Sequence, residues 1–90
     1  MAAALPASSL ALGLAKSAFA RGSFAEAEPL FRTIVEKYPN SDAAPEALYW
    51  AGVAKYKASG DPAALGETGR AFSTRYSDTS WAKKASVWNK

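Results

Sequence analysis

Residues 22–39 read GSFAEAEPLFRTIVEKYP, and this stretch decides the fold class. Its apolar side chains recur at alternating spacings of three and four, at Phe24, Ala27, Phe31, Ile34 and Tyr38. This spacing places them along one stripe, because an α-helix turns once every ~3.6 residues. The stretch therefore predicts an amphipathic helix that buries one side.

Signals at both ends bound this helix. Ser23 and Glu26 form an S-x-x-E capping box, in which we expect the serine oxygen to accept from the Glu26 amide. Tyr38-Pro39 predicts the end, because proline disfavours helical geometry in the residue before it. Pro29 lies inside and removes one backbone donor, so we expect a local bend there.

Upstream, a first helix is predicted between Pro6 and Gly22. A signal peptide is the alternative, because residues 10–15 are apolar and residues 18–20 loosely resemble a small-x-small cleavage site. However, no basic region precedes this run and Lys16 interrupts it, which favours the helix. The apolar run is also too short to span a membrane.

Downstream, three more helices are predicted, over about residues 43–58, from Asp61-Pro62 to about Tyr76, and after residues 77–79. Residues 40–42 supply capping side chains for the first of these, and Gly60 is its expected stop. The expected buried side of the next helix carries Leu65, Phe72 and Tyr76, while Gly66 and Gly69 indicate close approach to a neighbouring helix. The fold class is all-α, with four helices and a partial fifth.

The chain also repeats itself at an offset of 38 residues. Tyr38, Ala44, Ala47 and Trp50 fall on Tyr76, Ala82, Ala85 and Trp88. A helix-pair period in this range is typical of a solenoid, in which each pair buries its apolar face against the next. We predict one domain over residues 1–90, with repeats over about residues 8–41 and 42–78 and a partial or capping helix over about 79–88.

These residues resemble a tetratricopeptide repeat (TPR). Residues 22–27 followed by Phe31 and Pro39 are similar to its second helix, and residues 49–52 resemble its first. The second unit departs from the pattern, since Leu65 stands where the motif has a small alanine and Gly69 where it has an aromatic. We interpret this as an exchange of volume, large for small and small for large.

Residues 38–41 and 47–52 most resemble bacterial envelope TPR proteins, of the outer-membrane assembly lipoprotein and Tol-Pal-associated coordinator type. Residues 60–62 and 85–88 also resemble repeats appended to bacterial thioredoxin-fold proteins. The resemblance implies a protein–protein interaction scaffold. The alternative is an accessory segment of a larger thioredoxin-fold or cell-envelope protein without independent activity.

In this family the first helix of each pair lines a concave groove that holds a peptide or partner protein. Carried over position by position, the groove residues are Ser9, Leu12, Lys16, Phe19, Glu46, Tyr49, Val53, Tyr56 and Lys57. Aromatic anchors would supply buried area and the lysines would pair with acidic groups. The alternative for each residue is a plain structural role, with the rings in the core and the lysines on a solvated surface.

A separate basic, aromatic end comprises Trp81, Lys83, Lys84, Trp88 and Lys90. We predict that Trp81 and Trp88 pack on the fourth helix beside Phe72 and Tyr76, because a lone short helix is unstable in water. The other hypotheses are contact with an acidic partner, a nucleic acid or an anionic membrane, docking of a further repeat, and self-association through the two tryptophans.

Composition argues against an enzyme. The chain lacks cysteine and histidine, and its eight acidic residues are scattered without a D-x-D or E-x-x-E type cluster. No catalytic residues, metal site, cofactor or small-molecule substrate are therefore predicted. The net charge of +3 is too low to predict nucleic acid as the partner, and no segment predicts a membrane partner. Cytoplasm, periplasm and cell envelope all remain open as the compartment.

Overall fold

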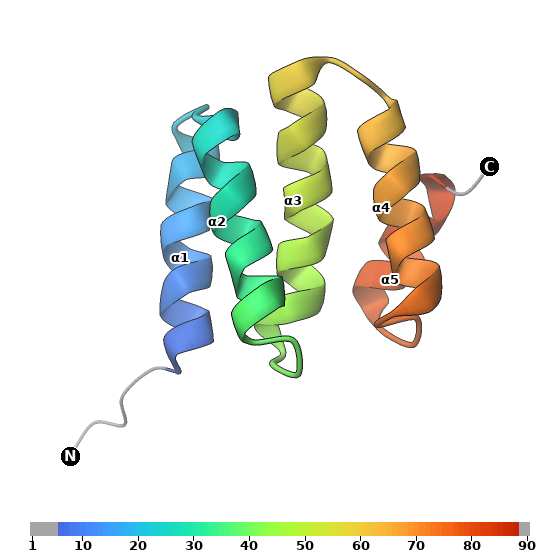
Figure 1. Cartoon of the computed structure of the whole chain (residues 1–90), viewed down its shortest axis with the longest axis horizontal. Helices are drawn as coiled ribbons and strands as arrows, with labels where there is room; N and C mark the ends of the chain where they lie inside the picture. Colours follow the sequence, from blue (N-terminus) through green and yellow to red (C-terminus); the bar gives the residue numbers. More distant parts are fainter. Residues whose placement is uncertain (1–5, 89–90) are drawn as a thin grey trace.

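The computed structural model describes residues 6–88, which form five α-helices and a terminal 3₁₀ turn without any strand (Figure 1). The elements are α1 (Ala7–Ala20), α2 (Phe24–Lys37), α3 (Ala43–Ser59), α4 (Ala63–Thr74), α5 (Ser80–Ala85) and η1 (Ser86–Trp88). The all-α prediction is confirmed, and α3 agrees with its predicted bounds to within a residue. No helix of this part of the chain is long and apolar enough to cross a membrane.

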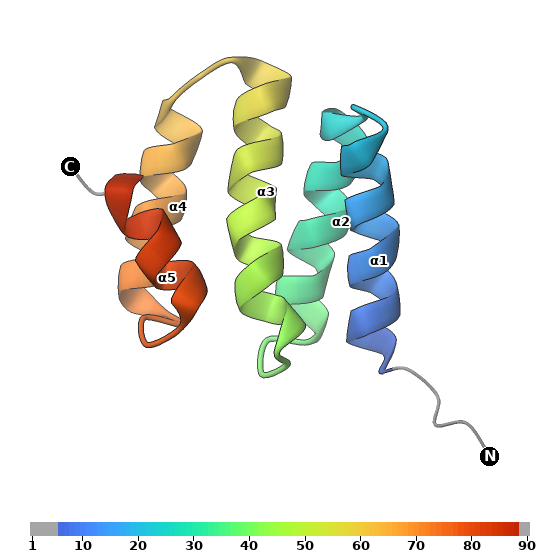
Figure 2. The same ribbon diagram turned by 180° about the vertical axis from the view of Figure 1, so that it is seen from behind.

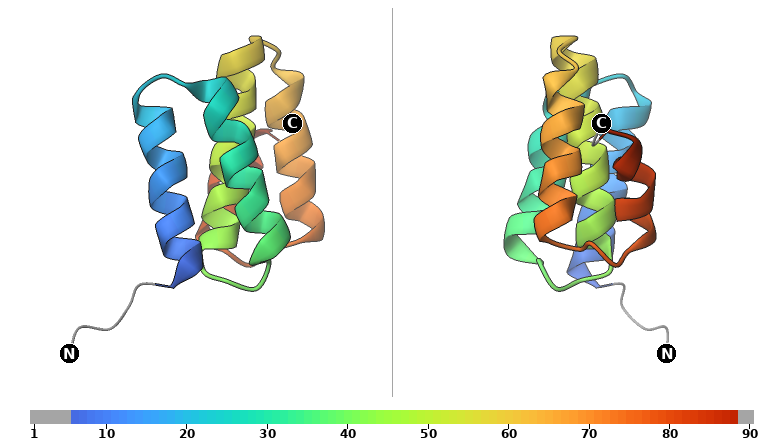
Figure 3. Two further views of the ribbon diagram at one scale, coloured as in Figure 1. Left: turned by 60° about the vertical axis from the view of Figure 1, so that its left-hand side comes forward. Right: turned by 90° about the vertical axis from the view of Figure 1, so that its right-hand side faces the viewer.

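The helices stand side by side as successive antiparallel hairpins, in a body of 48 × 30 × 18 Å. Seen from behind, α1, α3 and α5 face the viewer (Figure 2). The side view places α2 and α4 together on the opposite side, with α3 in the middle (Figure 3, right). The odd-numbered helices therefore share one face of the molecule, and α2 and α4 share the other.

The core is built from bulk on α2 and small side chains on α3. Phe31 and Ile34 of α2 are fully buried. The inner side of α3 is almost wholly alanine, at Ala44, Ala47, Ala51 and Ala54, all fully buried. Burying each large side chain contributes about 1.5–3 kcal/mol. Among the described residues, the most extensive helix–helix interface joins α2 to α3, because the large side chains of α2 pack against the small alanines of α3.

Two predicted N-terminal caps are wrong. Ser23 makes no side-chain cap bond; its backbone carbonyl accepts from the Glu26 amide, and the Glu26 carboxylate accepts from Arg21 at 2.9 Å. A guanidinium is a stronger donor to a carboxylate than a backbone amide is, which explains the exchange. Asp42 also makes no cap bond, because its backbone is already helical, and Ser41 donates instead to the Tyr38 carbonyl at 2.7 Å.

Other helix-end signals follow the predictions, although α4 begins at Ala63 rather than at Pro62 and ends at Thr74 rather than at about Tyr76. α2 stops at Lys37, directly before Tyr38-Pro39. Gly60 ends α3 in the left-handed conformation with a φ of 74°, which glycine adopts without steric cost. Asp61 accepts from the Ala63 amide at 2.9 Å, and Thr79 accepts from the Ala82 amide at 3.2 Å, so both side chains cap the following helix. α2 continues through Pro29, and the bend expected there stays a prediction.

The predicted buried side of the fourth helix is only partly right. Phe72 is buried, but Leu65 is half-buried, and Tyr76 lies beyond the end of α4 in a left-handed conformation with a φ of 60°. A Cβ on Gly66 would meet only the Arg70 guanidinium at 3.5 Å, so Gly66 makes no close approach to a neighbouring helix. For Gly69, which is buried, the expectation stays a prediction.

The repeat register also needs correction within α4. The buried residues Ala27, Phe31 and Val35 of α2 correspond to Ala64, Thr68 and Phe72 of α4, which is an offset of 37 rather than 38. The small alanine of the motif is therefore Ala64, and the exchange of volume inferred for Leu65 and Gly69 is wrong. Thr68 takes the place of the aromatic ring.

The loss of bulk at Thr68 is matched by a glycine on α3. A Cβ on Gly52 would lie 2.0 Å from the Thr68 hydroxyl oxygen and 2.7 Å from the Thr68 Cβ. The contact therefore exists only because position 52 has no side chain. The close approach expected of α4 is present, but it is made by Gly52 against Thr68.

Candidate interaction face

The sequence-predicted site residues all lie on α1 and α3, two of the three helices that Figure 2 turns toward the viewer. We call the side of the molecule formed by α1, α3 and α5 the odd-helix face. Its side chains come from three separate stretches of sequence, so its properties depend on how the hairpins stack.

Aromatic rings cross this face from helix to helix. Phe19 of α1 lies edge to face with Trp50 of α3, with ring centroids 5.3 Å apart, and Trp50 lies 5.2 Å from Tyr49. Tyr49 then meets Trp81 of α5 at 5.3 Å and stacks on Trp88 of η1 at 5.0 Å. We call these five residues the aromatic ladder.

The ladder ties the hairpins together and stays partly open to solvent. All five rings are half-buried. Each aromatic pair contributes about 0.5–1.5 kcal/mol beyond its buried area, so the ladder fixes the stacking of α1, α3 and α5. The rings are held in place before any ligand arrives, which suits them to anchor a partner at little entropic cost.

The position of the two C-terminal tryptophans corrects the prediction. α5 and η1 pack against α4, as predicted, but the ring contacts of Trp81 and Trp88 are made with Tyr49 on α3. Tyr49 and Trp50 present two adjacent rings to α5, whereas Tyr76 is used elsewhere, donating its hydroxyl to the Pro39 carbonyl. Lys90, part of the same predicted end, lies outside the described residues.

Lys16 and Glu46, both predicted for the site, are brought together. Their charged groups form an ion pair of 2.8 Å between α1 and α3. The indole of Trp50 donates to the same Glu46 oxygen at 3.2 Å. The Glu46 side chain is only 18% exposed, so it is partly desolvated, and one of its two oxygens accepts from both groups.

The C-terminal half of α3 carries two exposed predicted residues, Tyr56 and Lys57. Tyr56 is 37% exposed, and Lys57 holds its ammonium 5.4 Å from the ring centroid of Phe24. Val53 and Leu12 are half-buried and Ser9 is exposed. The structure thus places the predicted residues on one face, with Tyr49 and Phe19 serving both in packing and at the surface.

Sequence reasoning missed the central role of Trp50 and treated Trp81, Lys84 and Trp88 as a separate end. In the structure they continue the same face, and the Lys84 ammonium lies 4.3 Å from the Trp81 ring centroid. The adjacent pair Tyr49-Trp50 was the available signal, because two neighbouring rings on a helix point toward different neighbours.

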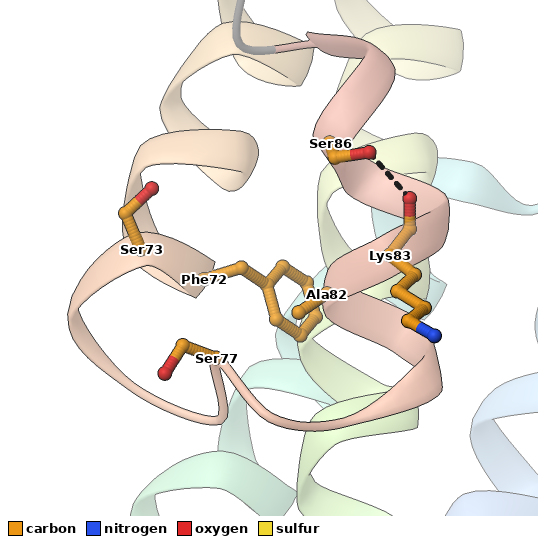
Figure 4. Close-up of a pocket in the computed structure, with 6 residues that line it drawn as sticks. All are labelled: Phe72, Ser73, Ser77, Ala82, Lys83 and Ser86. Carbon is orange, nitrogen blue, oxygen red and sulfur yellow. Dashed lines mark hydrogen bonds between the residues drawn. The ribbon is translucent and has the colours of Figure 1, made fainter.

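In the part of the chain that the structure describes, cavities lie between neighbouring helices beside this face. A cavity of about 260 Å³ lies between α4 and α5, where Phe72 faces Ala82 (Figure 4). Lys83 and the serines Ser73, Ser77 and Ser86 also line this cavity. A second, of about 280 Å³, lies between α2 and α4 over Leu48. A third, of about 460 Å³, lies between the α1–α2 turn and the end of α3. Within residues 6–88 no three metal-ligating side chains gather as a possible metal site.

Comparison with known families gives a match to the first hairpin. Residues 10–41 match the family model described as tetratricopeptide repeat. No curated protein and no solved structure matches the chain. Repeats of this family generally serve as protein-interaction scaffolds and are typically not enzymes. With residues 10–41 matched to the family and the following helices continuing the same hairpin arrangement, the chain is an all-α, TPR-like helical repeat protein.

Proposed function

We propose that this protein is an interaction scaffold that holds a peptide or a partner protein on its odd-helix face. The observation that carries this proposal is the aromatic ladder, which joins three helices while leaving every ring partly exposed. Preordered aromatic side chains are the residues that most often dominate binding energy at protein interfaces.

α3 stands at the centre of the proposed site. Its accessible residues Val53, Tyr56 and Lys57 continue along the helix from the ladder residue Tyr49. A bound segment would bury the free ring edges and contact Tyr56 and Lys57 at one end. Tyr56 has no ring contact that the fold needs, so we expect it to act mainly in binding.

A random peptide library displayed on phage tests this function with the purified chain. We expect a family of peptides to be enriched, and binding of the best one to weaken at least about tenfold in a Tyr56→Ser, Lys57→Gln variant, since interface hot spots cost about 2 kcal/mol or more. Tyr49 is left intact because α5 packs on it.

Leu30→Ser is the matched control. Leu30 is 38% exposed, nearly the same as Tyr56 at 37%, but lies on α2. It should bind the enriched peptide as the unchanged chain does. No enrichment above an unrelated helical protein, or equal loss in the Leu30 variant, would contradict the proposal.

The alternative is an accessory segment of a larger thioredoxin-fold or cell-envelope protein. Leu14 and Leu10 of α1 are 68% and 54% exposed, which favours a further body covering that helix. The resemblance to bacterial envelope repeats stays a prediction, because the matched family model covers residues 10–41 and does not single out envelope proteins. A thioredoxin-fold or envelope domain in the same reading frame would favour this alternative.

A further inference from the structure

We propose that the partner of the odd-helix face is an acidic polypeptide segment that also carries aromatic or aliphatic side chains. The inference rests on the proposed function and names the chemistry of the ligand.

Charge is distributed unevenly between the odd-numbered and the even-numbered helices. The helices α1, α3 and α5 carry five basic residues and one acidic residue, namely Lys16, Lys55, Lys57, Lys83, Lys84 and Glu46. The helices α2 and α4 carry three basic and four acidic residues, namely Arg32, Lys37, Arg70, Glu26, Glu28, Glu36 and Glu67. The odd-numbered helices thus hold all of the helical excess of positive charge.

Two of these lysines are directed elsewhere. Lys55 pairs with Glu67 of α4 at 3.3 Å, and Lys83 lines the cavity between α4 and α5. The remaining three, Lys16, Lys57 and Lys84, are distributed over α1, α3 and α5. Because Lys16 is paired with Glu46, the net positive charge along the ladder comes from Lys57 and Lys84.

Each of the three lysines is held against an aromatic group or beside one. Lys57 lies over Phe24 and Lys84 over Trp81, at 5.4 and 4.3 Å from the ring centroids. Lys16 shares the Glu46 carboxylate with the Trp50 indole. A ligand that places a carboxylate on such a lysine also brings its neighbouring side chains onto a ring, so charge and apolar contact come together.

The one acidic residue of these helices does not oppose an anionic ligand. Glu46 is already engaged by the Lys16 ammonium at 2.8 Å and by the Trp50 indole at 3.2 Å. Its charge is neutralised by an adjacent cation, so a negative segment approaching α3 meets the net positive charge of Lys57 and Lys84. This is the charge complementarity that selects an acidic partner.

The ring geometry favours a polypeptide over nucleic acid or a membrane. Single-stranded nucleic acid stacks its bases on open ring faces, yet Tyr49 and Trp88 stack on each other and Phe19 and Trp50 meet edge to face. Membrane insertion needs rings free to leave the protein surface, and all five ladder rings are half-buried. Ring edges that lie beside lysine ammonium groups can contact the apolar side chains of an extended or helical acidic peptide while the ammonium groups pair with its carboxylates.

The peptide display experiment extends to a test of this chemistry. We expect the enriched peptides to carry net negative charge together with aromatic or aliphatic residues. For the best one, replacing its Asp and Glu by Asn and Gln should weaken binding, and added salt should do the same, because exposed ion pairs are screened. The variant Lys57→Gln, Lys84→Gln should bind about two- to thirtyfold more weakly, from about 0.2–1 kcal/mol for each of the two exposed pairs.

Lys37→Gln, Arg70→Gln is the matched control, since it removes the same charge from α2 and α4. It should change the affinity less than twofold. Enriched peptides that are neutral or basic, or equal loss in this control, would overturn the acidic ligand while leaving the scaffold function intact. Tighter binding of an oligothymidine or of phosphatidylserine-containing vesicles than of the peptide would also overturn it. Absence of any enrichment would instead contradict the scaffold function itself.

Discussion

The two complete hairpins bury their second helices by different means. In the first hairpin, Phe31 of α2 is fully buried and its ring centroid lies 6.4 Å from that of Phe19 on α1. In the second hairpin, the equivalent residue of α4 is Thr68, which lies against the bare backbone of Gly52. A large side chain fills the space in one case, and close approach of the helices removes the space in the other.

The comparison shows that helical hairpins of one architecture can pack in two ways, provided that the facing residues of the two helices change together. The Thr68 hydroxyl is buried at 4% exposure, but it donates to the Ala64 carbonyl at 2.8 Å and is therefore satisfied. Dispersion contacts replace part of the lost ring area, because atoms of the two helices meet at short range. The first hairpin should therefore be sensitive to lost volume, and the second to added volume.

The largest expected effect is on the first hairpin. Phe31→Ala should lower the free energy of unfolding by about 3–5 kcal/mol, and Ile34→Ala by about 2–4 kcal/mol, since both side chains are fully buried and leave cavities. Leu30→Ala on the same helix, at 38% exposure, should cost about 1 kcal/mol. Urea midpoints that barely move for Phe31→Ala would show that α2 does not pack as described.

The second effect is specific to the other hairpin. Gly52→Ala should cost about 1–3 kcal/mol, because the new Cβ overlaps the buried Thr68 side chain. Gly13→Ala is the control: it lies inside α1 with nothing within 4 Å of the added Cβ, so it should stabilise by about 0.5–1 kcal/mol.

A double-mutant cycle sharpens this result. Adding Thr68→Gly to Gly52→Ala moves the missing side chain to the other helix, so the double variant should be more stable than the sum of the single effects predicts. Strict additivity of the two substitutions in urea unfolding would mean that α3 and α4 do not meet at this point.

The same difference explains what could be predicted from the sequence. The helix over Phe24–Lys37 was readable because its buried residues are large and its boundaries carry Gly22 and Pro39. The register of α4 could not be read from the sequence, because its buried residues Ala64 and Thr68 are small or polar and carry little hydrophobic signal. A close approach leaves no large side chain to mark it in a sequence.

For the candidate face, the sequence predicted which helices carry the residues but not which helices those residues contact. Helix periodicity with the family motif places Lys16, Glu46 and Tyr56 on first helices, and in the structure they lie on α1 and α3. Their role in binding stays a prediction. The contact of Trp88 with Tyr49 could not be predicted, since it depends on how α5 crosses α3. Local spacing fixes which side chains share a helix face, but not which neighbouring helix meets them.

The third effect concerns the stability that the second hairpin gains from the packing of α5 and η1 against it. Trp88→Ala removes the stack on Tyr49 and should cost about 0.5–1.5 kcal/mol. With all three tryptophans half-buried, we expect blue-shifted fluorescence from a monomer in sedimentation. A dimer that Trp88→Ala dissolves would show instead that the two tryptophans form an interface between copies.

The smallest expected effect compares an ion pair between the two hairpins with an ion pair inside the second hairpin. Lys16–Glu46 joins α1 to α3 at 2.8 Å, with side-chain exposures of 52% and 18%, whereas Lys55–Glu67 joins α3 to α4 at 3.3 Å with 43% and 55%. Coulomb attraction grows as separation and local dielectric fall, so the first pair should be the stronger. Double-mutant cycles with Lys→Met and Glu→Gln should give about 0.5–1 kcal/mol for Lys16–Glu46 and less than about 0.5 kcal/mol for Lys55–Glu67.

Glutamine at position 46 keeps an acceptor for the Trp50 indole, so the cycle reports the charge and not the loss of that hydrogen bond. Molar salt should reduce both couplings, and Lys55–Glu67 more completely, because both its groups are open to solvent. An equal or larger coupling for Lys55–Glu67 would place the better electrostatic contact in the closely packed second hairpin.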